Sequence, residues 1–360
     1  MNCYDVLIVG GGPAGSSCAW ALRHSGLKVA ILDKQIFPRD KVCGGWITPP
    51  VLTELEIDPE EYAAGRVFQP ITSFRIGAIG STPVDIDCRM PVSYGIRRRE
   101  FDDFLLKRCG AELLLGAPLK TLERWPEGWI VNQEIQARVL IGAGGHFCPI
   151  ARRVGAKAEY ESAVVAQEAE FVMDASQLAN CQVRGDTPEL YFCADMRGYG
   201  WCFRKGDVLN IGLGRADLHR LSSHVHEFLG FLKSTGRISF DPPAPHGHAY
   251  LLYGDSTRDV AGDGYLLVGD AAGLAYSQSG EGILPAIQSG LLAASRIVAG
   301  DLGSYRGLLE KKLGGSRYPW LEAFGRHLPP QLISSLAHRL VGKRWFAQRV
   351  VVDQWFLHAA

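Results

Sequence analysis

Three glycines near the N-terminus have the spacing of a turn that binds phosphate groups. Gly10, Gly12 and Gly15 fit the pattern G-x-G-x-x-G and directly follow an apolar run of β-forming residues. In such a turn the first glycine permits a tight bend, the second lets the backbone approach a pyrophosphate, and the third lets a helix pack closely on the strand. Asp33 ends the next apolar run, where a carboxylate accepts a hydrogen bond from a ribose hydroxyl. The sequence therefore predicts a dinucleotide site rather than a glycine-rich turn without a ligand.

A cysteine in the loop after Asp33 is the second candidate for chemistry. Residues 34–48 contain too much Gly, Pro and charge for a regular element. Loops that follow strands of such a sheet face the ligand crevice, so we expect this loop near the reactive end of the ligand. Cys43 stands between Lys41 and two glycines, and a nearby cation would stabilise its thiolate. We expect Cys43 to contact the substrate or the ligand, and it is a candidate to deliver a proton directly. The alternative is that Cys43 is a buried, inert thiol.

The elements that position these residues indicate an α/β fold of two interleaved domains. Further apolar runs followed by glycines, at 139–145 and 265–273, predict more parallel strands of a Rossmann-type domain. That domain would comprise residues 1–65, 97–158 and 249–303. Short strands in 66–96 and 159–248, with a helix over 218–232, predict an antiparallel-sheet substrate domain. We expect residues 304–360 to form a helical C-terminal segment.

One more group of strands is expected beside the Rossmann-type domain. The runs 113–115, 119–122 and 129–131 predict a small β-meander.

Composition excludes several classes of protein. The chain has 360 residues with 38 basic and 38 acidic side chains, and a nucleic-acid-binding protein would carry a basic surplus. Nine cysteines without a C-x-x-C pair predict reduced thiols in a cytosol rather than disulfides or a zinc site. His24, His146, His246 and His248 lack the spacing of metal ligands, so no metal is expected. We also expect no signal peptide and no membrane-spanning helix.

Three separated motifs give the chain a family resemblance over roughly residues 1–300. The glycine turn and Gly269-Asp270 are shared with the p-hydroxybenzoate-hydroxylase-like flavoproteins. Within that group, the chain resembles the geranylgeranyl reductase family. Lys41-Val-Cys-Gly-Gly45 looks like that family's Cys-Gly-Gly loop, and Gly198-Tyr-Gly-Trp-Cys-Phe-Arg-Lys-Gly-Asp207 looks like its Tyr-x-Trp-x-Phe-Pro-Lys stretch, with Asn210-Ile-Gly212 after it.

The chain departs from these patterns at two places. Arg204 stands where the family has proline. The aspartate that the hydroxylases carry after the strand in the middle of the chain is missing from Gly142-Ala-Gly-Gly145. The second departure weakens the case for reduction by NADPH in the manner of the hydroxylases. The electron donor, NADPH or another reductant, therefore stays open.

The resemblance implies FAD bound across the Rossmann-type domain. The pyrophosphate and adenosine ribose would be held by the glycine turn, Asp33 and Lys34, and Asp270 would bind the ribityl chain or the pyrophosphate. The residues implied at the cofactor are Gly10, Gly12, Pro13, Ala14, Gly15, Asp33, Lys34, Lys41, Cys43, Gly44, Arg98, Gly144, Gly269, Asp270, Ala271, Gly273, Gly280, Gly282 and Ile283.

The reaction implied by the resemblance is the reduction of carbon–carbon double bonds in an apolar, isoprenoid-like substrate. A flavin performs the redox step, while the protein supplies position and electrostatics. Tyr191, Tyr199, Trp201 and Phe203 would wall the substrate site, with Gly45 and Trp46 from the cysteine loop; the alternative is that these aromatics are sheet core. Tyr199 and Trp201 are two residues apart and share a face. Cys43, Tyr199 and Trp201 are the candidate catalytic residues.

Other interpretations stay open from the sequence alone. The rival activities are a flavin-dependent monooxygenase or halogenase, and a flavin-binding protein without turnover. Arg204 and Lys205 are expected in a solvated turn, or else at an anionic substrate tail. The aromatic residues Trp345, Phe346, Trp355 and Phe356 could cap the cavity, dock at a bilayer or contact a partner such as a carrier protein. The oligomeric state is not indicated. We expect a cytoplasmic protein, with peripheral membrane contact as an alternative.

Overall fold

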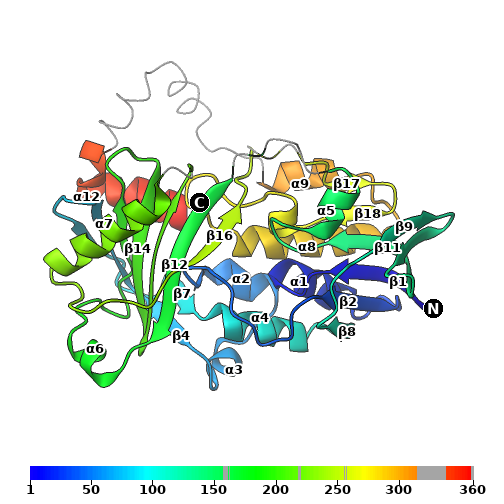
Figure 1. Cartoon of the computed structure of the whole chain (residues 1–360), viewed down its shortest axis with the longest axis horizontal. Coiled ribbons are helices and arrows are strands. Elements are labelled where there is room, and N and C mark those ends of the chain that lie inside the picture. The colour runs from blue at the N-terminus through cyan, green and yellow to red at the C-terminus, as the bar shows by residue number, and fades with distance from the viewer. Residues whose placement is uncertain are drawn as a thin grey trace, which may run out of the picture.

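The computed structural model describes residues 1–156, 161, 163–217, 220–254, 256, 258–313 and 338–357. Two large sheets lie side by side along the long axis of the molecule, one around β1 and β11 and the other around β12 and β14 (Figure 1). The first sheet belongs to the Rossmann-type part of the chain and the second to the part expected to bind substrate.

The first sheet has eight strands, in the order β17-β18-β11-β1-β2-β8, with a β9–β10 hairpin attached to β11. The strands are β1 (Asn2–Val9), β2 (Val29–Asp33), β8 (Glu112–Leu115), β9 (Leu122–Trp125), β10 (Gly128–Val131), β11 (Ile135–Gly142), β17 (Ala261–Gly262) and β18 (Tyr265–Leu267). β11 and β18 run parallel to β1, which confirms the α/β fold class. The carboxyl ends of these strands therefore meet at one edge, where such sheets bind ligands.

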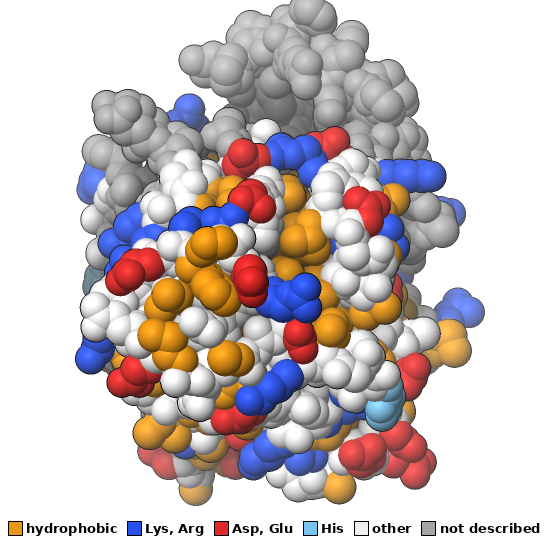
Figure 2. Space-filling view, turned by 90° about the vertical axis from the view of Figure 1, so that its right-hand side faces the viewer, with side chains coloured by type: hydrophobic (Ala, Val, Ile, Leu, Met, Phe, Trp, Pro, Cys, Tyr) orange, Lys and Arg blue, Asp and Glu red, His pale blue; other side chains and the backbone are white. Residues whose placement is uncertain are grey.

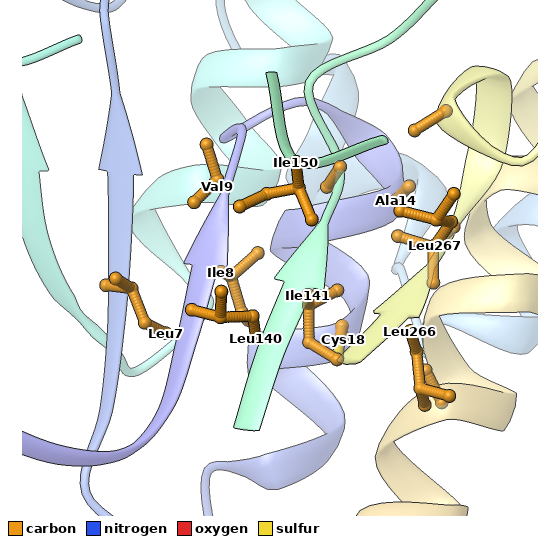
Figure 3. Packing of buried hydrophobic residues seen from close by; sticks show 14 of the residues in the cluster. Leu7, Ile8, Val9, Ala14, Cys18, Leu140, Ile141, Ile150, Leu266 and Leu267 are labelled. Carbon is orange, nitrogen blue, oxygen red and sulfur yellow. The ribbon is translucent and has the colours of Figure 1, made fainter. Parts of the chain in front are cut away.

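The core of this sheet explains why its strands are almost continuously apolar. Leu7 and Ile8 of β1 and Leu140 and Ile141 of β11 are fully buried, because helices cover the sheet. Figure 3 shows these side chains packed beside Leu266 and Leu267 of β18, with Cys18 and Ala14 on the helix behind them. That helix, α1 (Pro13–Leu22), packs closely against α8 (Ile283–Val298).

The predicted β-meander is wrong in its first strand. β8 pairs in parallel with β2 at the edge of the main sheet, so Leu113 aligns with Ile31. Only β9 and β10 form an antiparallel hairpin. Alternation of apolar residues predicts a strand but carries no information on its pairing partner, which is why the edge strand was misplaced.

The second sheet has seven strands in the order β16-β12-β15-β14-β13-β5-β6. They are β5 (Ser73–Ala78), β6 (Val84–Asp87), β12 (Val164–Val172), β13 (Glu189–Phe192), β14 (Gly198–Lys205), β15 (Val208–Arg215) and β16 (His246–Tyr250). The pairings are antiparallel except between β5 and β13, which are parallel. α7 (Leu221–Ser234) packs on one face of this sheet. Residues 218 and 219, where the sequence predicted that helix to begin, lie outside the described residues.

A third, small sheet links the other two. It has the order β3-β7-β4 and consists of β3 (Trp46–Ile47), β4 (Phe68–Ile71) and β7 (Ser93–Ile96). The strands expected in 66–96 are thus divided, since β5 and β6 join the second sheet and β4 and β7 pair in the third. β3 brings the end of the cysteine loop against β7, which places this loop between the two large sheets.

The remaining helices surround these sheets. They are α2 (Pro49–Glu54), α3 (Pro59–Ala63), α4 (Arg98–Lys107), α5 (Pro149–Arg153), α6 (Ala175–Ala179), the 3₁₀ turn η1 (Gly269–Ala271), α9 (Tyr305–Leu313), α12 (Arg344–Phe346) and the π-helix η2 (Ala347–Phe356). In the predicted C-terminal helical segment, residues 314–337 and 358–360 lie outside the described residues. Within the described part of the chain, no helix has the length and apolar character needed to cross a membrane.

Surface charge follows the balanced composition. Lys and Arg side chains are intermixed with Asp and Glu on the face shown in Figure 2.

Candidate active site

A cavity of about 630 Å³ lies where the two large sheets meet the cysteine loop. Its volume is within the range of ~300–1,000 Å³ typical of small-molecule sites. Most of the residues singled out from the sequence line it: Gly10, Gly12, Pro13, Ala14, Asp33, Lys34, Lys41, Cys43, Gly44, Gly45, Trp46, Arg98, Gly144, Tyr199, Trp201, Phe203, Asp270, Gly280, Gly282 and Ile283. The fold thus brings the separate sequence motifs, from Gly10 to Ile283, together in one site.

The glycine turn has the geometry that its spacing predicted. Gly10 has φ +118°, and a side chain there would overlap the backbone of Ala143. A side chain at Gly15 would overlap the carbonyl oxygen of Gly10, so this glycine permits close packing of α1 rather than lining the cavity. Gly12 lies at the cavity wall, and its nearest neighbour is Arg39, 3.6 Å from an added Cβ. The start of α1 therefore faces open space.

Asp33 is fixed at the cavity by two backbone N–H groups. Its Oδ2 accepts a hydrogen bond from Gly11 N at 2.7 Å, and its Oδ1 accepts one from Gln35 N at 2.8 Å. The carboxylate is only partly buried and lines the cavity beside Lys34. It is therefore oriented at the end of β2 with lone pairs left for a hydroxyl ligand.

Two arginines converge on one buried carboxylate beside the glycine turn. Arg98 donates to both oxygens of Asp102, at 2.8 and 2.9 Å, and Arg39 reaches the same carboxylate at 3.1 Å. Both arginines line the cavity. The Nη1 atom of Arg39 is buried and has no hydrogen-bond partner among the described residues. Because buried donors are normally paired, this atom marks a position that an anionic ligand would complete. Arg39 was not predicted from the sequence, because it lies in an irregular loop without a motif.

Lys41, His248 and Asp270 form a chain of polar contacts across the cavity. Lys41 Nζ lies 2.7 Å from His248 Nε2, which lies 3.7 Å from Asp270 Oδ2. Burial lowers the pKa of Lys41 to about 8, although Asp270 opposes this shift. Burial alone would raise the pKa of Asp270, but the hydrogen bond from His248 and the positive charge of Lys41 outweigh it and lower that pKa. His248 was missed as a site residue, because a lone histidine on a strand has no sequence signal.

The cysteine loop is held by polar side chains of the second sheet. Cys43 N donates to Glu168 Oε1 at 2.5 Å, Asn210 Nδ2 donates to Cys43 O at 3.1 Å, and Lys205 Nζ donates to Gly44 O at 3.0 Å. The solvated turn expected for Lys205 is therefore wrong: the residue is 1% exposed and its ammonium also pairs with Glu170 at 2.7 Å. These contacts place the Cys43 thiol at the cavity, partly exposed and within hydrogen-bonding reach of Arg98.

Aromatic side chains form the wall opposite the glycine turn. Tyr199, Trp201 and Phe203 alternate along β14 and face the cavity together. Trp46 lies edge-on to Phe203 at 6.0 Å and is stacked on Phe356 of η2 at 5.0 Å. The C-terminal π-helix thus contributes Phe356 to the cavity wall. This agrees, for Phe356, with the alternative that the C-terminal aromatic residues cap the cavity.

Tyr191 was wrongly expected in this wall. It lies on β13 with its ring packed against Phe228 and Phe231 of α7, on the other face of the sheet. Its hydroxyl donates to Glu189 at 2.8 Å. The register pairs Tyr191 with Gly200, so it shares the face of Gly200 and points away from the face of Tyr199 and Trp201.

Three residues expected at the cofactor lie behind the cavity instead. Gly269 packs against Ala14 and Ala286, and its N–H donates to Ser289. Ala271 and Gly273 are buried and do not line the cavity, because the 3₁₀ turn directs only Asp270 towards it. Gly269 thus permits close packing of α1 and α8, whereas Gly273 packs against Ser256 and Leu251.

The residues present fit FAD. The open start of α1 and the unpaired Arg39 Nη1 suit a pyrophosphate, and Asp33 suits a ribose. Gly280 and Gly282 leave the cavity lining beside Ile283 without bulky side chains, which suits a ring. Arg98, Lys41 and Asp270 would complete the polar surroundings. When bound, FAD supplies two-electron redox chemistry that no side chain offers.

Comparisons with known proteins agree with this site. A model of FAD dependent oxidoreductases matches residues 5–75. A geranylgeranyl diphosphate reductase of Rhodobacter capsulatus is 31% identical over 82% of this chain and 75% of its own, and a menaquinone reductase of Mycobacterium tuberculosis is 29% identical over 90% and 85%. The crystal structure of a geranylgeranyl bacteriochlorophyll reductase-like protein from Thermoplasma acidophilum has a TM-score of 0.77 at 22% identity, over 96% of this chain and 92% of its own.

The fold and the cavity define a FAD-dependent oxidoreductase. More closely, the chain belongs to the geranylgeranyl reductase family, as its Cys-Gly-Gly loop and aromatic stretch indicated. A flavin-dependent brominase also shares the fold, with a TM-score of 0.68 at 20% identity, but this likeness concerns the fold alone.

Proposed function

We propose that this protein uses reduced FAD to saturate carbon–carbon double bonds of a small apolar, isoprenoid-like substrate. The observation that carries this proposal is the aromatic wall of Tyr199, Trp201 and Phe203, which lines the cavity directly beside the Cys43–Gly45 loop. An isolated alkene has no carbonyl group to take up charge, so its reduction requires a dry and closely shaped site. The names of the relatives, which include geranylgeranyl and digeranylgeranylglycerophospholipid reductases, support a polyprenyl chain as substrate.

Each group at the site has a role in this proposal. The aromatic wall and Phe356 exclude water from the site. They would hold the polyprenyl chain of the substrate beside the flavin. Gly44 lies close to Phe203, with only 3.2 Å between an added Cβ and that ring, so the loop and the wall together set the width of the site. Cys43 touches the substrate, and Tyr199, whose hydroxyl donates to Ser279 O, orients the wall.

The proposal is tested by single-turnover reduction in the absence of oxygen. The purified protein, loaded with FAD, is photoreduced and mixed with geranylgeranyl diphosphate, a digeranylgeranyl glycerophospholipid or menaquinone. Reoxidation of the flavin without oxygen, together with a product that has gained two hydrogen atoms at a double bond of its prenyl chain, supports an alkene reductase. The position of the added hydrogen atoms is determined by NMR, because reduction of the menaquinone ring to a quinol also adds two hydrogen atoms. NADPH is offered separately to the oxidised protein as an electron donor.

Oxygen distinguishes the rival activities. Reoxidation only when air is admitted would contradict the proposal and favour a monooxygenase or a halogenase, as expected for some structural neighbours. The Cys43→Ala variant should bind FAD normally but react more slowly with the alkene.

A further inference from the structure

Two glutamates on β12 occupy neighbouring positions on one face, in opposite environments. Glu168 and Glu170 are two residues apart on the strand and therefore point to the same side of the sheet. Glu168 is 4% exposed and lines the cavity. The site therefore contains a carboxyl group that the family motifs did not indicate.

Glu170 is surrounded by cationic and amide donors. Its Oε2 accepts hydrogen bonds from Lys205 at 2.7 Å and Asn210 at 3.2 Å, and its Oε1 lies 3.4 Å from Arg97 Nε. Burial alone would raise the pKa of Glu170, but the charge of Lys205 and these hydrogen bonds outweigh it and lower that pKa. Glu170 is therefore the member of the pair whose ionised form is favoured.

Glu168 has fewer such partners, although the Asn210 amide lies near enough to favour its charged form. One oxygen accepts the N–H of Cys43, and the other, Oε2, is buried with no hydrogen-bond partner among the described residues. Burial raises the pKa of Glu168 to about 7. The Cys43 N–H, the charge of Lys205 and the Asn210 amide oppose this rise, and Glu170 adds to it. Two carboxyl groups whose environments separate their pKa values in this way are typical of an acid and its ionised neighbour.

The surroundings of Glu168 connect it with the substrate wall. Gly212 is its partner in register on β15, and the Trp201 ring lies over that glycine beside the Glu168 side chain. On the opposite side, its partner on β16 is the exposed His246, while His248 of the same strand binds Lys41. The buried carboxyl group thus lies between Cys43 and Trp201 in the lining of the cavity.

We propose that Glu168 is the internal acid of the cavity, which holds the proton consumed by alkene reduction and passes it to a substrate carbon. This inference rests on the proposed function, in which bound, reduced FAD would be the source of the hydride for the other carbon. As the π bond breaks, its electron pair forms a C–H bond with the proton of Glu168, the O–H bond of the carboxyl group breaks, and a carboxylate remains. The carboxylate then takes a proton from water before the next turnover.

Infrared spectroscopy of the oxidised, FAD-loaded protein tests the protonation state without turnover. The C=O stretching band of a protonated carboxyl group should disappear with a midpoint near pH 7 in the wild type, and this component should be absent from Glu168→Gln. A midpoint in the ordinary range of a glutamic acid, or an unchanged titration in the variant, would overturn the assignment.

Single-turnover reoxidation by the alkene tests the transfer itself. General acids contribute about 10²–10⁴-fold to rates, so Glu168→Gln should react at least about tenfold more slowly and lose the fall in rate that the wild type shows above pH 7. Glu168→Asp retains a titrating group and should recover part of the rate. Glu227→Gln, on the exposed side of α7, serves as the control and should match the wild type.

The outcomes separate this inference from the proposed function. If wild-type flavin is not reoxidised by any alkene without oxygen, the proposed function fails, and the proton assignment with it. The other outcome is an active wild type and a Glu168→Gln variant with the same rate and the same pH profile. If the FAD absorbance and thermal unfolding of that variant are also unchanged, only the assignment of Glu168 fails.

Discussion

The ammonium group of Lys205 donates a hydrogen bond to the carbonyl oxygen of Gly44 at 3.0 Å, although the two residues are 161 positions apart in the chain. This contact joins the end of β14 to the loop that carries Cys43. Lys205 also donates to Ile96 O at 2.8 Å and to Glu170, so all three of its N–H donors are satisfied. A fully buried lysine thus holds the reactive loop against the substrate sheet.

Replacement of Lys205 should therefore destabilise the protein strongly. Lys205→Met leaves Glu170 with a buried charge that Arg97 only partly compensates, and removal of one partner of a buried pair costs about 3–5 kcal/mol. Urea unfolding measures the loss in free energy of unfolding. Lys233→Met, which breaks the exposed pair with Asp241, should cost at most about 1 kcal/mol. Similar losses in the two variants would contradict the role of Lys205.

Gly12 should be required for FAD but not for folding. It has φ −73° and a neighbour no closer than 3.6 Å to an added Cβ, so the chain alone accommodates alanine. A methyl group at the start of α1 would occupy the space of a pyrophosphate, so Gly12→Ala should weaken FAD binding at least about tenfold, or ~1.4 kcal/mol. Fluorescence titration of the apoprotein measures the affinity.

The exposed helical Gly230 provides the matched substitution for this test. Gly230→Ala meets no atom within 4 Å and should bind FAD normally, with stability raised by up to about 1 kcal/mol. Normal FAD binding by Gly12→Ala would show that the pyrophosphate does not lie at this turn.

Tyr199 and Tyr191 provide a matched pair on opposite faces of one sheet. Tyr199→Phe removes a hydroxyl that anchors the cavity wall to Ser279 and should slow single-turnover reduction several-fold. Tyr191→Phe removes a hydrogen bond to Glu189 outside the cavity and should cost about 1 kcal/mol in stability with an unchanged rate. The two rates are measured with the same alkene. A slower reaction in Tyr191→Phe alone would contradict the observed placement of the two rings.

FAD affinity should fall as the pH rises from 7 to 9. Burial lowers the pKa of Lys41 from its ordinary value of 10.5 to about 8, so its positive charge, which favours an anionic cofactor, is lost through this range. Unfolding does not explain such a loss: between about pH 8 and 10.5 the unfolded chain binds more protons at Lys41, so this residue's contribution to stability rises with pH.

The dissociation constant of FAD measured across this pH range checks the prediction. Lys41→Met should bind FAD several-fold more weakly at pH 7 and lose the pH dependence between 7 and 9. Lys107→Met, on the exposed side of α4, should behave as the wild type. An undiminished slope in Lys41→Met would assign the titration to another group.

The sequence alone determined the parts of this protein that depend on short-range pattern. The glycine turn, the strand before it and Asp33 are recognisable because backbone conformation and close packing restrict which residues fit at fixed spacing. Alternation along β14 likewise placed Tyr199 and Trp201 on one face. These local rules were sufficient for the α/β fold class and for a dinucleotide site. That the dinucleotide is FAD, bound to an oxidoreductase, was implied by the family resemblance.

Only the tertiary structure decided which polar residues meet at the reactive loop. Glu168, Asn210 and Lys205 reach Cys43 and Gly44 across more than a hundred residues of chain. Burial, which the sequence does not show, raises the pKa of Glu168. Strand pairing, which periodicity does not specify, likewise placed β8 in the main sheet and turned the face of β13 that carries Tyr191 towards α7. Pairing and burial are properties of the assembled chain, so no single stretch of the sequence contains them.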